Sequence, residues 1–252
     1  MPKILPDGEK NKLPELSFFM PAYNEAANIR EAMRQAMAIL PKVAKRFELI
    51  VINDGSMDNT LHVARAFQAE HPDLVRVVSQ KNTGYGGALK RGFKEARYEW
   101  IFFTDSDLQF NVEEISRFLP YAHSADLIIG HRLRRAEGWT RQTLAKWLRI
   151  WNFLWLDFPL SIKDIDCAFK LIRKNVLDQI SPFVSDGAMI STEILLKSYL
   201  ISCKIDQVGV HHYRRFAGLP TGNDVRVIFR AVHDTFVLRR AVKKFALEHT
   251  AD

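Results

Sequence analysis

Residues 100–107 of this 252-residue chain read WIFFTDSD, an apolar run that ends in two aspartates one residue apart. The run is short and continuous, which is typical of a strand buried inside a sheet. Side chains alternate along a strand, so Asp105 and Asp107 share one side and project together from its end. Two hard oxygen donors in that position suit Mg²⁺ or Mn²⁺ holding a diphosphate. An acidic turn that caps a following helix is the competing interpretation, because Asp and Ser are also common turn residues.

Similar apolar runs alternate with helical patterns on either side of this strand. The expected strands are Leu16–Met20, Glu48–Ile52, Leu74–Ser79, Trp100–Thr104 and Asp126–Gly130. The expected helices cover about 25–40, 58–70, 84–97 and 111–122. Apolar runs without polar alternation, joined by helices, predict an α/β fold with a mostly parallel, Rossmann-like central sheet and helices on both faces.

Polar, small and aromatic residues follow four of these strands. The segments read PAYNE at 21–25, NDGSMDNT at 53–60, KNTGYGG at 81–87 and DSD at 105–107. Because the ligands of a parallel sheet bind beyond the carboxyl ends of its strands, four such segments together predict a nucleotide site. The third glycine of G-x-G-x-x-G is absent, since Leu89 stands there, and G-K-[ST] is absent as well. A dinucleotide fingerprint and a P-loop are therefore both excluded.

The composition indicates one large globular domain, with 47% hydrophobic residues and ample core. We expect a flexible tail at 1–14, a catalytic domain at 15–222, and a basic amphipathic helix with a tail at 223–252. No apolar run approaches the roughly 20 residues of a membrane span, and the N-terminus does not resemble a signal peptide. Cys167 and Cys203 form no C-x-x-C motif, so a reducing cytoplasm is the expected compartment.

The net charge of +7 is concentrated in two segments. Residues 131–149 carry six Arg or Lys against one glutamate, a local charge of +5. Residues 211–245 carry eight against two aspartates, a local charge of +6. Positive charge confined in this way predicts an anionic partner, which could be lipid headgroups, a phosphorylated substrate or nucleic acid. A solvated basic face is the competing interpretation for each segment.

Two helical patterns bear on a membrane contact. Within Trp139–Leu160, tryptophans recur every fourth residue at Trp147, Trp151 and Trp155. This spacing fits an interfacial helix at a membrane, or alternatively a stripe packed against the core. Val225–Phe245 reads as a basic amphipathic helix, for which lipid, the domain itself or a dimer partner are all suitable contacts.

The four strand-end segments match, in order, the motifs of family 2 glycosyltransferases of the GT-A fold. The chain most resembles their polyprenyl-phosphate branch, typified by dolichyl-phosphate mannose synthase, over about residues 14–222. The resemblance implies that Asp105 and Asp107 bind a metal and a diphosphate, with Gln109 as a further metal ligand. It also implies that the nucleotide of a sugar donor lies against seven residues: Pro21, Tyr23, Glu25, Asp54, Asn82, Gly84 and Ser106.

The second half of the chain resembles the acceptor side of the same family. Gly130-His131-Arg132 resembles a G-S-R motif whose arginine contacts the lipid phosphate, and the resemblance implies that Arg141 and Arg215 also bind phosphate. Two acidic residues match later positions of the family and are further site candidates: Asp164, which precedes a motif ending in Phe169-Lys170, and Glu193.

The resemblance implies a metal-dependent, inverting transferase that moves a hexose from GDP-mannose or a UDP-hexose to polyprenyl or dolichyl phosphate, peripherally at the cytoplasmic face of the membrane. Asp105, Asp107 and Arg132 would carry the catalysis. A phosphate monoester is largely anionic at neutral pH and needs no general base, whereas a saccharide hydroxyl would need Asp164 or Glu193. A non-catalytic basic module that binds membrane or RNA is a third interpretation. The D-x-D-x-Gln pattern disfavours it, so no nucleic-acid partner is expected.

Overall fold

The computed structural model describes residues 12–133, 155–156, 158–159, 161–215 and 225–249, and for 225–233 the backbone alone. Strands and helices alternate through the first half of the chain, as the sequence predicts. The strands are β1 (Leu13–Ala22), β2 (Ala44–Asp54), β3 (Val75–Gln80), β4 (Trp100–Thr104), β5 (Leu127–Arg132), β6 (Phe169–Arg173) and β7 (Ile205–Val210). The helices are α1 (Ile29–Val43), α2 (Thr60–Glu70), α3 (Gly84–Glu95), α5 (Lys174–Ile180), α6 (Ile190–Leu200) and α7 (Val225–His249), with the short 3₁₀ helices η1 (Val112–Arg117) and η2 (Leu119–Tyr121).

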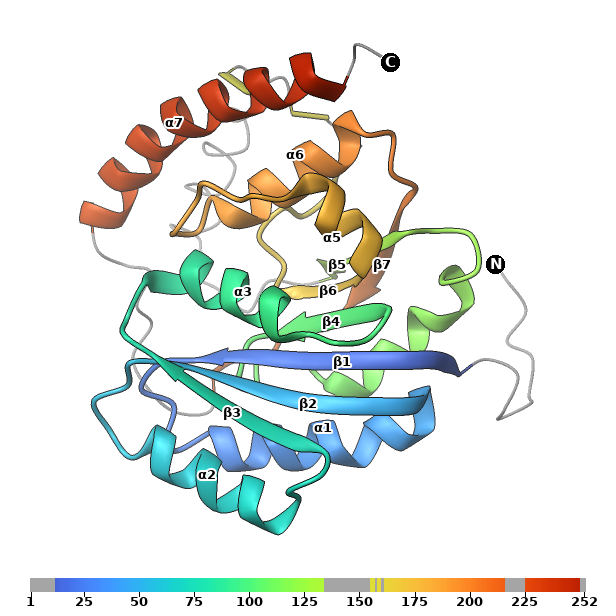
Figure 1. The fold of residues 1–252 in the computed structure, drawn as a ribbon, viewed down its shortest axis with the longest axis vertical. Helices are drawn as coiled ribbons and strands as arrows, with labels where there is room; N and C mark the ends of the chain where they lie inside the picture. Colours follow the sequence, from blue (N-terminus) through green and yellow to red (C-terminus); the bar gives the residue numbers. More distant parts are fainter. Residues whose placement is uncertain (1–11, 134–154, 157, 160, 216–224, 250–252) are drawn as a thin grey trace.

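The described strands form one sheet in the order β3-β2-β1-β4-β6-β5-β7 (Figure 1). β1 pairs in parallel with β2 and β4, and β2 pairs in parallel with β3. β6 is antiparallel to both of its neighbours, β4 and β5, while β5 and β7 are parallel to each other. Every strand of this sheet except β6 therefore points the same way, and the prediction of a mostly parallel sheet is confirmed.

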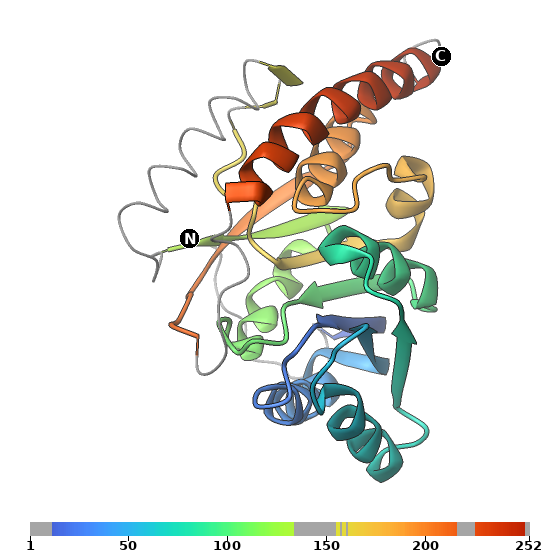
Figure 2. The same ribbon diagram turned by 90° about the vertical axis from the view of Figure 1, so that its left-hand side faces the viewer.

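Helices cover both faces of the sheet, which explains why its strands are apolar without alternation. In Figure 1, α1 and α2 lie below the sheet, whereas α3, α5, α6 and α7 lie above it. β4 shows the consequence. Trp100 and Phe102 belong to the core on the α1 side, and Ile101 and Phe103 belong to the core on the α3 side. Figure 2 shows α7 running across the outside of α6. Leu238 of α7 is buried in the core on the α3 side of the sheet.

Two expectations from the sequence need correction. The helix expected at 111–122 is instead the pair η1 and η2. Pro120 falls inside this segment and cannot donate a backbone hydrogen bond, so a continuous α-helix does not form. β6 was not predicted, because its second residue is Lys170, and a lysine that is fully buried in a strand runs against the usual exposure of that residue type.

Gly92 lies where α3 crosses β1, and a Cβ built there would overlap the ring of Phe19, which is completely buried. Gly92→Ala should therefore destabilise the fold by roughly 1–3 kcal/mol through overpacking. This is opposite to the gain of about 1 kcal/mol that the same change gives in an open helix. Chemical denaturation measures the difference, with the exposed helical position Lys94 changed to Ala as the matched control. A stabilised Gly92→Ala protein would show that the helix and the strand do not pack this closely.

Candidate active site

The predicted strand-end segments lie together at one edge of the sheet. β3, β2, β1 and β4 are neighbours in this order and run in parallel, so the segments 81–87, 53–60, 21–25 and 105–107 leave the sheet side by side. β5 and β7 end at the same edge, which brings Arg132 and the segment 211–215 there as well. The aspartates after β4 are thus flanked by the segments after β1, β2 and β3 on one side and by the segments that carry Arg132 and Arg215 on the other.

Asp105 and Asp107 are held at the end of β4 by short polar contacts. The Ser106 hydroxyl donates to the Pro21 carbonyl at 2.8 Å, which ties the end of β4 to the end of β1. The backbone N–H of Gln109 donates to Asp107 Oδ1 at 3.1 Å. The buried Ser106 hydroxyl thus fixes the loop that carries both carboxylates, and the expected contact of Ser106 with the nucleotide stays a prediction.

Electrostatics at this loop favour a bound cation. Burial, and then the charge of Asp107, raise the pKa of Asp105 to about 7, against the opposing effect of a hydrogen bond from Tyr85. Burial likewise raises the pKa of Asp107. Tyr85, which the sequence did not single out, comes from the glycine segment at the start of α3, and burial followed by the charge of Asp105 raises its pKa. Two carboxylates that are costly to ionise side by side become easier to ionise when a cation lies between them.

The two aspartates suit Mg²⁺ or Mn²⁺, which can complete their coordination with water and substrate phosphates. They are too few to hold a metal ion by protein ligands alone. Among the residues that the structure describes, no third His, Cys, Asp or Glu joins the two aspartates in a metal-binding group. Mg²⁺ is commonly held by one or two carboxylates together with waters and substrate phosphates. The Gln109 side-chain amide nitrogen donates to the Tyr213 carbonyl at 3.1 Å, which leaves its amide oxygen as the atom suited to a metal.

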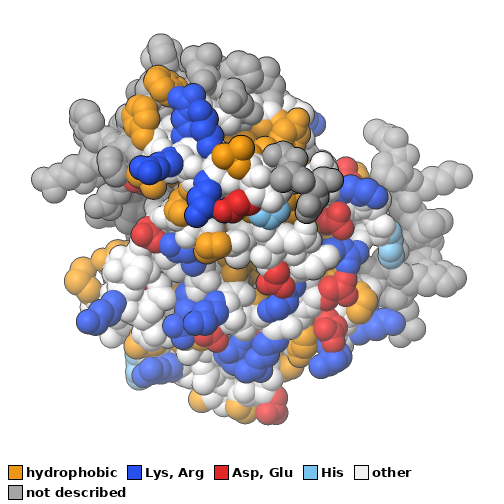
Figure 3. Space-filling view, turned by 45° about the horizontal axis from the view of Figure 1, so that its top comes forward, with side chains coloured by type: hydrophobic (Ala, Val, Ile, Leu, Met, Phe, Trp, Pro, Cys, Tyr) orange, Lys and Arg blue, Asp and Glu red, His pale blue; other side chains and the backbone are white. Residues whose placement is uncertain are grey.

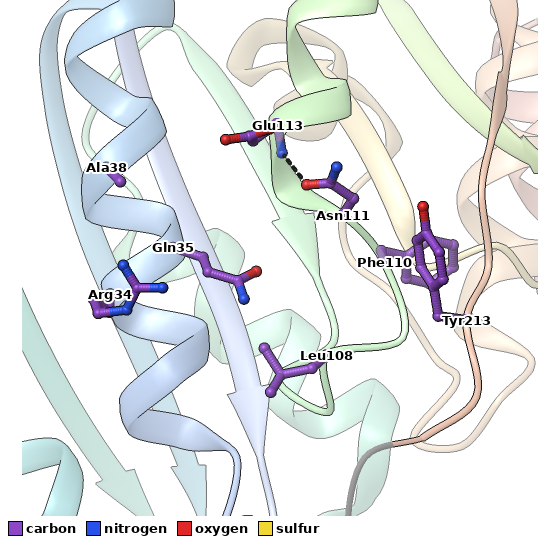
Figure 4. Close-up of a pocket in the computed structure, with 8 residues that line it drawn as sticks. All are labelled: Arg34, Gln35, Ala38, Leu108, Phe110, Asn111, Glu113 and Tyr213. Carbon is purple, nitrogen blue, oxygen red and sulfur yellow. Dashed lines mark hydrogen bonds between the residues drawn. The ribbon is translucent and has the colours of Figure 1, made fainter.

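The loop after Asp107 turns sharply and opens a cavity. Leu108 has a backbone φ of 62°, a left-handed conformation that is uncommon for a residue with a side chain. The cavity has a volume of about 400 Å³ and lies between α1, this loop and Tyr213 (Figure 4). Phe110, Asn111 and Tyr213 line one side of it, and Arg34 and Gln35 of α1 line the other.

Asp54 organises the neighbouring glycine segment. Its Oδ1 accepts hydrogen bonds from the Thr83 backbone N–H at 3.0 Å and from the Gln80 side chain at 2.8 Å, and its Oδ2 accepts one from the Gly84 N–H at 3.0 Å. The Asn82 side chain also accepts from Gly84, at 3.1 Å. The buried carboxylate of Asp54 thus fixes the start of α3. The expected contact of Asp54 with the nucleoside stays a prediction.

Glu25 and Arg215, expected on the donor and acceptor sides respectively, form an ion pair with each other. The Asn28 side chain also donates to Glu25 Oε2, at 2.6 Å. The segment that carries Arg215 is anchored to the metal loop, because the Tyr213 N–H donates to the Gln109 carbonyl at 2.8 Å. The structure therefore joins the segments that follow β1, β4 and β7. Tyr23 is partly buried beside them, after β1.

Arg132 and Asp164 form a bidentate pair. The guanidinium Nε lies 2.7 Å from Asp164 Oδ2, and Nη2 lies 2.9 Å from Oδ1. Both side chains are buried, with 8% and 4% exposed. Burial lowers the pKa of Arg132, but the hydrogen bond and charge of Asp164 raise it overall. Arg141, the neighbouring candidate, lies outside the described residues.

Glu193 and Lys170 are both completely buried. Glu193 accepts backbone hydrogen bonds from Val184 and Ser185 and does not lie open to an acceptor. Lys170 donates to the backbone carbonyl of Ile165 at 3.2 Å. Burial lowers the pKa of Lys170, while acidic neighbours that include Asp105 and Asp164 raise it. In the sequence, the only indication of a role for Lys170 was the Phe169-Lys170 dipeptide, which matches the end of a family motif.

A mostly parallel sheet with a D-x-D motif at the end of a central strand is typical of glycosyltransferases of the GT-A type. A family model described as glycosyl transferase family 2 matches residues 17–181. The chain belongs to this family, and it is a glycosyltransferase.

Solved structures share the fold. Glucosyl-3-phosphoglycerate synthase from Mycobacterium tuberculosis, in complex with Mn²⁺, UDP-glucose and phosphoglyceric acid, superposes with a TM-score of 0.65 at 20% identity, covering 91% of this chain and 79% of that one. Its complex with Mn²⁺, UDP and glucosyl-3-phosphoglycerate gives 0.61 at 21% identity, with 94% and 80% covered. A further mycobacterial protein gives 0.63 at 20% identity, with 94% and 74% covered. The expected divalent metal thus has a counterpart in Mn²⁺ of these complexes, whereas the polyprenyl-phosphate branch stays a prediction.

Two expectations concern the membrane. Most of Trp139–Leu160, the expected interfacial helix, lies outside the described residues. Among the helices that the structure does describe, none combines the length and the apolar character that crossing a bilayer requires. α7 confirms the helix expected at Val225–Phe245.

The raised pKa of Asp105 predicts that this residue lowers the free energy of unfolding at high pH although transfer activity requires it. With metal removed by EDTA, Asp105 stays protonated up to about pH 7 in the folded protein but ionises near pH 4 when unfolded. Folding therefore loses free energy as the pH rises through this window. Asp105→Asn should raise the free energy of unfolding by roughly 1–3 kcal/mol at pH 8, and the gain should vanish near pH 4, while transfer activity is lost.

Thermal unfolding across pH 4–8 measures this effect. Asp178→Asn, at an exposed position of α5, is the matched control and should change little at any pH. A gain in Asp105→Asn that does not depend on pH, or a loss of stability at pH 8, would contradict the electrostatic account.

Proposed function

We propose that this chain is a metal-dependent, inverting glycosyltransferase that moves a hexose from a nucleotide-diphosphate sugar to the phosphate of a polyprenyl phosphate. The observation that carries the proposal is the position of Asp105 and Asp107. They follow β4 in the middle of the sheet, with the segments after β1, β2 and β3 on one side and those after β5 and β7 on the other. A donor and an acceptor bound on opposite sides would meet at the metal.

The proposed site for the nucleotide-sugar donor is formed by Asp105, Asp107 and the glycine segment 81–87. A bound Mg²⁺ or Mn²⁺ would neutralise the charge that develops on the leaving diphosphate. Asp105, Asp107 and the amide oxygen of Gln109 would hold it. Asp54 and Asn82 would orient the backbone of Gly84 toward the nucleotide. UDP-hexoses and GDP-mannose are the candidate donors, and the UDP-glucose complex of the mycobacterial neighbour supports testing the first.

The proposal of a phosphate acceptor rests on the hydrogen bonds that Asp164 and Glu193 already form. A saccharide hydroxyl needs a general base, and the two candidates for that role are already engaged. Asp164 is bound at both oxygens by Arg132, and Glu193 is buried against backbone N–H groups. A phosphate monoester is already anionic at neutral pH and needs no base. This favours a phosphate acceptor over a saccharide hydroxyl.

Arg132 is the residue proposed to meet the acceptor phosphate. Asp164 binds its Nε and Nη2, and the phosphate would be bound by the same guanidinium. The pairing holds the guanidinium in a fixed plane, which suits a ligand recognised by geometry as well as charge. Arg141 and Arg215 are proposed as further phosphate contacts. Arg215 would have to exchange its bond to Glu25 for the substrate.

A lipid acceptor requires contact with a membrane surface, and α7 offers one. Phe236 and Val237 are 49% and 46% exposed, and the exposed Arg240, Lys243 and Lys244 follow them. Figure 3 shows hydrophobic and Lys or Arg side chains intermingled on the upper part of the molecule, where α7 runs. Apolar and basic side chains on one helix suit an anionic lipid surface. We therefore propose peripheral binding to the membrane.

A panel of acceptors tests this proposal. The protein is incubated with Mn²⁺ and either UDP-glucose or GDP-mannose, together with polyprenyl phosphate in detergent, 3-phosphoglycerate or an oligosaccharide. We expect release of nucleoside diphosphate and a sugar-phosphate linkage on the polyprenyl phosphate. Transfer to 3-phosphoglycerate alone would keep the phosphate chemistry but refute the lipid. Transfer to the oligosaccharide alone would favour a hydroxyl acceptor, and release of pyrophosphate would indicate a nucleotidyltransferase.

Arg132→Lys tests the proposed phosphate contact. Lysine keeps the positive charge but lacks the planar guanidinium, which can bind two oxygens at once. We expect the apparent acceptor affinity to fall roughly ten- to a hundredfold, the loss typical of one charge-assisted hydrogen bond, while donor affinity measured by calorimetry stays near wild type. Arg117→Lys, at an exposed ion pair with Glu114, is the matched control. Equal losses for donor and acceptor would mean that Arg132 serves only the local fold.

A further inference from the structure

The loop between α5 and α6 supports the glycine segment from the side opposite Asp54. The Gly86 N–H donates to the Asp186 carbonyl at 2.8 Å, and Lys90 forms an ion pair with the Asp186 carboxylate. A Cβ at Gly86 would lie 2.6 Å from the Ser185 carbonyl oxygen, and one at Gly84 would lie 2.9 Å from that of Asp186. The two backbones approach so closely that this contact requires glycine at both positions.

A buried ion pair on α6 holds this loop in place. The Glu193 carboxylate accepts from the Val184 N–H at 3.0 Å and from the Ser185 N–H at 2.9 Å. Lys197, one turn later, lies 2.9 Å from Glu193. It also donates to the backbone carbonyls of Ile180 and Pro182, at 3.1 and 2.6 Å. The Glu193 and Lys197 side chains are 0% and 4% exposed, so these bonds form away from competing water.

The contacts form a continuous series from α6 to the metal loop. Glu193 fixes Val184 and Ser185, and the carbonyl of the next residue, Asp186, receives the Gly86 N–H. Tyr85, between the two glycines, interacts with Asp105: burial, followed by the charge of Asp105, raises the pKa of Tyr85. The glycine segment is therefore clamped between Asp54 at the end of β2 and the loop that Glu193 organises.

We propose that Glu193 and Lys197 are positioning residues for the donor site, which they reach through the 184–186 loop and the Gly84–Gly86 segment. The inference rests on the proposed function, in that the glycine segment faces the donor nucleotide. It replaces the role of general base considered for Glu193. A carboxylate that is fully buried and bound by two backbone N–H groups and a lysine has no oxygen to offer an acceptor hydroxyl.

Glu193→Gln tests the inference with two readouts. Glutamine has nearly the same shape but no charge. Its NH₂ group has to face either Lys197 on the Oε1 side or the Val184 and Ser185 N–H groups on the Oε2 side, so one side of the contact is lost. We expect faster amide hydrogen exchange at Gly86, and a dissociation constant for UDP or GDP in Mn²⁺ that rises roughly tenfold. Acceptor affinity should stay near wild type. Glu48→Gln is the matched control, because Glu48 is likewise buried and ion-paired, with Arg76, but belongs to a cluster near the other end of α3.

Exchange at Gly86 separates the inference from the proposed function. Faster exchange at Gly86 in Glu193→Gln but not in Glu48→Gln, together with weaker nucleotide binding, supports the positioning role. Unchanged exchange, or faster exchange with unchanged nucleotide binding, overturns it. Wild-type protein that binds neither UDP nor GDP overturns the proposed donor site and with it this role. If Glu193→Gln does not fold, Lys90→Met weakens the same contact from its partly exposed side. The same two changes are then expected in smaller measure, and their absence overturns the role.

Discussion

Two like charges held side by side at the end of a buried strand are the constraint on which the rest of the site depends. The pleat of β4 aims Asp105 and Asp107 in one direction, and the Ser106 hydroxyl bond to Pro21 prevents the loop from turning away. Burial raises the pKa of both carboxyl groups, and the charge of Asp107 raises that of Asp105 further. Such an arrangement costs stability, and it is typical of sites whose function needs a cation.

The charged residues around this pair are already bound to one another. Arg132 is paired with Asp164, Arg215 with Glu25, and Lys197 with Glu193. The pairs differ in their surroundings. Asp164 binds Arg132 through Nε and Nη2 and holds the guanidinium in one plane. The proposed role of Arg215 would require its pair with Glu25 to be exchanged for substrate, whereas the Glu193 pair is wholly internal. Charges that are already held in place, as in the Arg132 pair, need little rearrangement when the substrates bind.

Much of the fold could be predicted from the sequence, because short apolar runs separated by helical patterns leave few arrangements other than a covered parallel sheet. The strand-end segments could be identified for the same reason. The partners of the polar side chains could not. Nothing in the sequence shows that the Asp54 carboxylate fixes the start of α3 or that Asp164 binds Arg132, since these contacts join residues 29 to 32 positions apart. β6 was missed because a buried lysine breaks the apolar pattern, and Tyr85 because an aromatic residue between glycines reads as a turn.

The central claim is that Asp105 and Asp107 hold a divalent cation together with the diphosphate of the donor. The most direct test is a titration with Mn²⁺, followed by electron paramagnetic resonance, in the presence and absence of UDP or GDP. The account predicts one site whose affinity rises when the nucleoside diphosphate is present and which is lost in Asp107→Ala. Mn²⁺ affinity that is the same with and without nucleotide, or that survives Asp107→Ala, would contradict it.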